Sequence, residues 1–87
     1  MLFDIVRELN DQMNLMVNEG MPGRTVPMLF GTTDGYNVHI TFMDQLVWSN
    51  ADWKFESDDE ATELKRIKAH IRERITEHLT RLYNIQF

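Results

Sequence analysis

The chain has 87 residues, of which 43% are hydrophobic and 26% charged, with a formal net charge of −5 and no cysteine. This length provides one hydrophobic core, and the composition excludes disordered, collagen-like and low-complexity classes. Without cysteine there is no disulfide, thiol nucleophile or thiolate metal site. We therefore expect one compact domain over residues 1–87.

Membrane insertion and secretion are not expected. The longest uninterrupted apolar run, Val26–Phe30, is far shorter than the roughly 20 residues of a membrane-spanning helix. The first residues lack the basic stretch and hydrophobic segment of a secretory signal. The sequence therefore predicts a cytoplasmic protein that does not act in a membrane.

Residues 2–19 predict an amphipathic helix, because apolar residues recur at spacings of three and four. Gly20 follows, where a left-handed C-terminal cap is usual. Leu15 points away from the apolar stripe. The stripe consists of Leu2, Val6, Leu9, Met13, Met16 and Val17.

Residues 25–43 predict a β-hairpin around Thr33-Asp34-Gly35. A two-residue Asp34-Gly35 turn would mix apolar and polar side chains on both faces. A three-residue loop with Gly35 as a left-handed bulge instead pairs Phe30 with Val38 and Met28 with Ile40, which makes one face uniformly apolar. Leu29 and Gly31 would then lie on the other, half-polar face.

A third strand is predicted at residues 45–49, a short fourth one at 53–55, and a long helix after Ser57-Asp58-Asp59-Glu60. Ser57 is the expected N-cap, because a Ser three residues before Glu satisfies two amide groups. An apolar stripe then continues to Leu82, and the helix should end near Tyr83.

These elements predict a two-layer α+β fold with the order α-β-β-β(-β)-α. Two helices should pack on one face of an antiparallel sheet of three or four strands. The expected core consists of Leu9, Met13, Phe30, Ile40, Phe42, Leu64, Ile71 and Ile75.

The order of elements resembles that of double-stranded RNA-binding domains. In those domains the lysine-rich start of the last helix binds phosphates. The corresponding segment here, residues 58–63, is acidic. Residues 1–60 hold 11 acids and 3 bases, and residues 61–87 hold 3 acids and 6 bases. Nucleic acid is therefore an unlikely partner. The alternative is a nucleic-acid-binding module that uses Lys65, Lys68 and Arg72. The same three residues are also consistent with a solvated flank of the last helix, or with a patch that binds another copy of the chain.

The acidic residues predict a surface for a protein partner with a basic face, because such charge steers association. Helix capping accounts for Asp58, Asp59 and Glu60, but it leaves Asp52 and Glu56 unexplained. Trp48 and Trp53 fit either the edge of the core or an exposed anchor. The candidate partner-binding residues are Asp44, Asp52, Trp53, Glu56, Asp58 and Asp59.

The sequence contains few residues arranged for catalysis or metal binding. Ser49 and Ser57 are the only serines, and no phosphate-binding loop is present. His70 and Glu73 are neighbours on the last helix, but a metal needs three or four ligands. We expect no catalytic residue, no metal and no cofactor.

Self-association is a further expectation. Tyr83, Ile85 and Phe87 alternate as an extended segment would, and a small domain has little core left to bury them. Together with Leu15 they predict a homodimer contact. The alternative is that this tail folds back onto its own core.

The sequence thus predicts a small acidic, non-enzymatic interaction protein that binds a basic or nucleic-acid-handling protein, with inhibition as one outcome of binding. Small acidic inhibitors encoded by phages have a similar size and charge without a shared motif, which makes a phage or another mobile element a candidate source. A self-assembling structural subunit is the other alternative.

Overall fold

The computed structural model describes residues 2–20 and 26–84. The elements follow the order α1 (Leu2–Gly20), β1 (Leu29–Asp34), β2 (Asn37–Phe42), β3 (Gln45–Ser49) and α2 (Glu60–Tyr83). The three strands form one antiparallel sheet in the order β1-β2-β3. The predicted α+β fold is therefore confirmed, with three strands.

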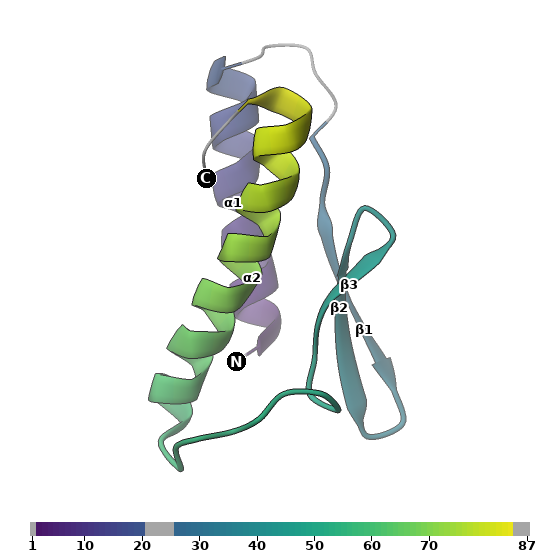
Figure 1. Ribbon diagram of the computed structural model, residues 1–87, viewed down its shortest axis with the longest axis vertical. Helices are drawn as coiled ribbons and strands as arrows, with labels where there is room; N and C mark the ends of the chain where they lie inside the picture. The colour runs from purple at the N-terminus through teal and green to yellow at the C-terminus, as the bar shows by residue number, and fades with distance from the viewer. Residues whose placement is uncertain (1, 21–25, 85–87) are drawn as a thin grey trace.

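The helices form one layer and the sheet forms the other. Figure 1 shows α1 and α2 beside each other, with the strands along one side of the pair. Both helices run in the same direction, and the connection from β3 reaches the lower end of the molecule, where α2 begins below the start of α1 (Figure 1). Neither helix is long and apolar enough to cross a membrane, as judged from the described residues.

The helical stripes predicted from the sequence fill the interior. They meet the sheet residues Ile40 and Phe42, which have no exposed surface, and also Val47 and Trp48. Trp48 is thus a core residue, with 4% of its surface exposed. The helical core residues are Ile5, Val6, Leu9, Met13, Val17, Ile67, Ile71, Ile75 and Leu79.

The predicted register of the first hairpin is wrong. The turn contains two residues, Gly35 and Tyr36, and pairs Asp34 with Asn37 and Leu29 with Phe42. Gly35 has the expected positive φ, at 59°. Relative to the predicted pairing, β1 shows its opposite face to the core, because successive side chains of a strand point to opposite faces.

The placement of Phe30 in the core is wrong for the same reason. Leu29 is 2% exposed and lies in the core, whereas Phe30 is 59% exposed. Phe30 and Leu46 both pair with Thr41, so these three residues lie in a row on the sheet face that the helices do not cover.

Two contacts from α1 hold β1 in the observed register. The Asn10 side chain donates a hydrogen bond to the Leu29 carbonyl (3.1 Å) and accepts one from the Leu29 amide (2.8 Å). The ring of Phe3 covers Gly31, where an added Cβ would lie 2.7 Å from Phe3 Cδ1. A side chain at position 31 would have to displace this ring.

The connections around β3 also differ from expectation. The turn between β2 and β3 consists of Met43 and Asp44, both with positive φ, at 52° and 63°. Residues 53–55 form no strand, so the predicted fourth strand is wrong. The Asp52 amide bonds to the Ser49 carbonyl (3.3 Å) in the turn after β3, and Trp53 then packs against both His70 of α2 and Trp48 of β3.

The predicted N-cap of α2 is wrong by two residues. Asp59 is the cap, and its carboxylate accepts a hydrogen bond from the Thr62 amide (3.1 Å). Ser57 Oγ instead accepts one from the Asp59 amide (3.1 Å) and so stabilises the turn before the helix. The helix ends at Tyr83 as predicted, with Asn84 in the left-handed conformation as its C-cap.

Candidate partner-binding surface

Most of the predicted partner-binding residues lie in one segment, the connection between β3 and α2. We call residues 50–59 the acidic loop. Its side chains Asp52, Glu56 and Asp58 are exposed, and so is Asp59 at the start of α2. Figure 1 shows the loop running across the lower end of the molecule to the start of α2. The fold therefore presents these carboxylates at one end of the molecule.

A partly buried ion pair fastens this loop to α2. Arg66 Nη1 donates to both carboxylate oxygens of Glu63, at 2.7 and 2.6 Å, and the Glu56 amide donates to Glu63 Oε1 at 3.0 Å. Glu63 is only 4% exposed, and a buried carboxylate needs such donors. The Arg66 hydrogen bonds lower the pKa of Glu63 against the opposing effect of burial. The carboxylate thus remains ionised and holds the loop.

Trp53 belongs to the same attachment. The Arg66 guanidinium lies 4.8 Å from the centre of the Trp53 ring, a cation–π arrangement. The ring also packs against His70, at 5.4 Å between centroids, and Trp48, at 6.1 Å. Trp53 is partly buried, so it contributes mainly to holding the loop on α2. We call Trp53, Glu63 and Arg66 the loop anchor.

The anchor leaves a different aromatic residue exposed. Phe55 is 56% exposed, two residues after Trp53 and next to Glu56. Phe55 was not predicted from the sequence as a binding residue, and neither were Glu63 and Arg66. The spacing of Glu63 and Arg66 by three residues was an available signal, because such residues meet on a helix.

Two acidic residues stand apart from the others in their roles. Asp59 caps α2, and the hydrogen bonds from Thr62 lower the pKa of its carboxyl group. Asp44 lies in the turn before β3, whereas the acidic loop follows β3. The length of β3 therefore separates Asp44 from the acidic loop, and the structure does not bring them together.

The basic residues of α2 do not form an unpaired row. Lys68 Nζ lies 2.5 Å from Glu8 Oε1 on α1, so its charge is compensated. Lys65 and Arg72 are exposed on either side of it. The central residue of the predicted nucleic-acid-binding alternative thus joins the two helices.

The predicted self-association residues are described only in part. Leu15 is 59% exposed on α1. Tyr83 is the last residue of α2, while Ile85 and Phe87 lie outside the described residues. The structure therefore places one of the four side chains, on the surface of α1.

The serine and histidine side chains that could take part in catalysis have structural roles instead. Ser49 Oγ accepts a hydrogen bond from the Ala51 amide at 3.2 Å, and Ser57 caps the turn before α2. His78 is buried, with its ring 5.6 Å from that of Phe42. Within residues 2–20 and 26–84, no three His, Asp or Glu side chains converge to hold a metal ion.

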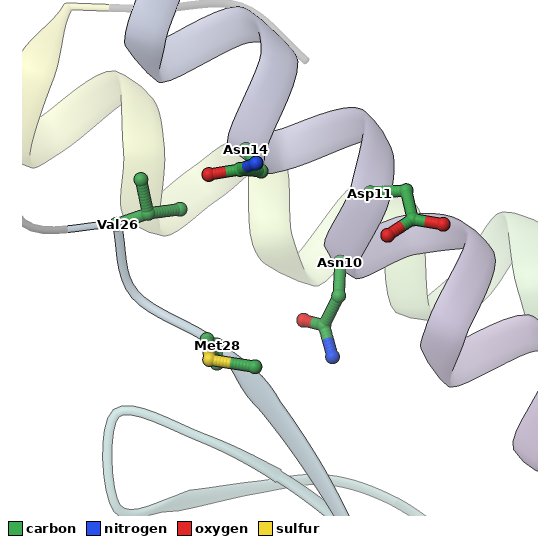
Figure 2. Close-up of a pocket in the computed structure, with 5 residues that line it drawn as sticks. All are labelled: Asn10, Asp11, Asn14, Val26 and Met28. Atoms are coloured by element: carbon green, nitrogen blue, oxygen red, sulfur yellow. The ribbon is translucent and has the colours of Figure 1, made fainter. Parts of the chain in front are cut away.

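A pocket of about 290 Å³ lies between α1 and the segment that leads into β1. Figure 2 shows Asn10, Asp11 and Asn14 on the helix side and Val26 and Met28 opposite. Asn10 already bonds to Leu29, and Asn14 accepts a hydrogen bond from Asn18 (3.0 Å). Among the described residues the lining therefore offers one exposed carboxylate, Asp11, and no second titratable side chain.

Comparison of the chain with protein-family models finds no match, and comparisons with curated proteins and with solved structures find none either.

Proposed function

We propose that this protein is a small acidic, non-enzymatic interaction protein that binds a basic surface on a protein partner through the acidic loop. The observation that carries the proposal is the loop anchor. It holds the loop against α2 while Asp52, Phe55 and Asp58 stay exposed. A preordered loop loses less conformational entropy on binding than a flexible one.

The chemistry of the loop fits a partner with basic and apolar groups. The exposed carboxylates steer a positively charged surface toward the loop, and the net charge of −5 adds to this attraction. Phe55 supplies the apolar contact, since buried aromatic side chains often dominate binding energy. A protein that handles nucleic acid has such a surface, and covering it would inhibit that protein.

The experiment is affinity capture from nuclease-treated lysate of the source cells, with three baits. The first is the natural chain. The second carries Asp52→Asn, Glu56→Gln and Asp58→Asn, and because Glu56 also pairs with Arg66 at 3.5 Å, its thermal midpoint is compared with that of the natural chain. The third is matched in charge but changed elsewhere, with Asp11→Asn, Glu19→Gln and Glu73→Gln, all at exposed positions. We expect the natural and matched baits to retain a common basic protein that the loop variant loses.

Salt gives an independent readout of the same mechanism. The Debye length falls from about 10 Å at 0.1 M to about 3 Å at 1 M, so association with the captured protein, once purified, should slow strongly over this range. Phe55→Ala should speed dissociation instead. Capture that is equal for both triple variants, or association indifferent to salt, would reject the acidic-loop mechanism.

A further inference from the structure

The edge of the sheet at β1 has hydrogen-bonding groups that point away from β2. In an antiparallel pair, alternate residues bond to the neighbouring strand. The two-residue turn makes Asp34 and Asn37 a bonded pair, so Phe30, Thr32 and Asp34 bond toward β2. The bonds of Leu29 to Asn10 confirm that the alternate residues point outward.

Gly31 and Thr33 also point outward by this alternation, and their backbone groups are open. No described residue donates to or accepts from their amides and carbonyls on this side. β1 contains no Lys, Pro or bulge, the devices that usually protect a sheet edge. The chain thus closes its edge at Leu29, through Asn10, and leaves two consecutive bonding positions available.

We propose that a second copy of this chain pairs with β1 through its own β1, antiparallel and around a two-fold axis that passes between the two Thr32 residues. Gly31 of each copy then lies opposite Thr33 of the other. Four backbone hydrogen bonds form, and they use the four open groups on each copy. The result is one continuous six-stranded sheet with a self-complementary interface.

The position of the axis follows from the groups already in use. An axis at Gly31 would place Thr33 opposite Leu29, whose amide and carbonyl are bonded to Asn10. An axis at Thr33 would place Gly31 opposite Gly35, which lies in the turn. The axis at Thr32 satisfies both open positions, and it places opposite Leu29 only Gly35 of the other copy, where that chain turns toward its own β2 and leaves room for the Asn10 hydrogen bonds.

Side chains next to the edge are compatible with this pairing. Asp34 lies opposite Phe30 of the other copy, so no like charges face each other across the new ladder. Thr32 faces Thr32, a pair that suits adjacent strands. Phe3 covers Gly31 and is 48% exposed, and the axis brings the two rings to the same side of the joined sheet. This interface is separate from the acidic loop and from Leu15.

Cross-linking tests the axis directly, because the natural chain has no cysteine. Two Thr32→Cys side chains would occupy a non-bonded antiparallel pair, with Cα atoms about 4.5 Å apart, within the range of a disulfide. We expect mild oxidation to give a disulfide-linked dimer. Tyr36→Cys, at the fully exposed tip of the hairpin, is the matched control and should cross-link much more slowly. Equal rates for the two variants would overturn the proposal.

Charge exchange provides a second test that needs no oxidation. Thr32→Lys and Thr32→Glu should each abolish the dimer, because like charges would meet at the axis, and an equimolar mixture should restore it. Thr32 is exposed, so both variants should keep the thermal midpoint of the monomer. Sedimentation of the natural chain at about 1 mM should show more mass than the 10.3 kDa monomer.

A natural chain that remains monomeric at that concentration would reject the dimer. Single Thr32 variants that dimerise as strongly as the natural chain would reject the axis. An equimolar mixture of Thr32→Lys and Thr32→Glu that stays monomeric would reject it too. Capture of a different protein that is lost in both Thr32 variants would also overturn the proposal, because it would make the edge a site for another chain. The acidic-loop variants should dimerise normally, so this proposal and the proposed function fail independently.

Discussion

The ring of Phe3, in the first turn of α1, lies directly over the backbone of Gly31 in β1. This contact joins two segments far apart in the chain, and a side chain at position 31 would have to move the ring. We expect Gly31→Ala to destabilise the protein by up to about 1 kcal/mol, because the new methyl group displaces the half-exposed ring of Phe3. Urea unfolding measures the change. In a Phe3→Ala background the same substitution should cost less, and an equal cost would contradict the contact.

Alanine substitutions at adjacent positions distinguish the observed register from the predicted one. Leu29→Ala should lower the unfolding free energy by about 2–5 kcal/mol, because Leu29 is buried. Phe30→Ala should change it by less than about 1 kcal/mol, since Phe30 is mostly exposed. The reverse order, measured by thermal or urea unfolding, would show that Phe30 occupies the core.

The Asn10 side chain should contribute more to stability than its neighbours on the same helix face. Asn10→Ala removes two hydrogen bonds to Leu29 and should cost about 1–3 kcal/mol. Asn14→Ala is the matched control, because among the described residues its amide group bonds to Asn18 alone, at the surface, and its gain in helix propensity is the same. Equal stabilities of the two variants would show that the Leu29 backbone finds other partners.

The turn between β2 and β3 can be improved. Met43 and Asp44 both have positive φ, which a type I′ turn requires and which Asn-Gly adopts more easily. Met43→Asn combined with Asp44→Gly should raise the unfolding free energy by about 0.5–2 kcal/mol. Tyr36→Asn, in the other hairpin turn, should have little effect because Tyr36 lacks a positive φ. A calorimetric midpoint that does not rise for the double variant would count against this turn.

Acid should loosen the acidic loop through Glu63. Its pKa is lowered in the folded protein by the Arg66 hydrogen bonds, so its contribution to stability is complete above the ordinary value of 4.5 and is lost as the pH falls through the lowered value. We expect Glu63→Gln to be less stable at pH 7 and to lose less stability on acidification. Glu73→Gln, exposed on the same helix, should behave like the natural protein. Parallel stability curves for Glu63→Gln and the natural protein would rule this out.

The helices were predictable because their signals are local. The stripes of α1 and α2 repeat within each segment, and Gly20 and the acidic residues before Glu60 mark helix ends. The N-cap of α2 was predicted at the wrong residue, because Ser57 and Asp59 both have side chains that can cap a helix. In the structure Ser57 Oγ accepts a hydrogen bond from the Asp59 amide instead, and residue type alone does not predict this turn.

The register of β1 was not predictable for a physical reason. Met28, Leu29 and Phe30 are three consecutive apolar residues, so either alternation buries a large side chain. The choice depends on Asn10 and Phe3, which approach from α1 only after the chain has folded. The loop anchor has the same character: the sequence indicated an acidic segment, but the burial of Glu63 depends on packing between separate elements.

The two tryptophans of this chain have an optical consequence. Trp48 and Trp53 are its only indoles, and they lie together where β3, the acidic loop and α2 meet. Their ultraviolet emission therefore reports on this junction and is largely blind to events at α1 or β1. A ligand that binds the acidic loop should shift the wavelength or intensity of the emission without any attached dye. Pairing at the β1 edge should leave the spectrum nearly unchanged.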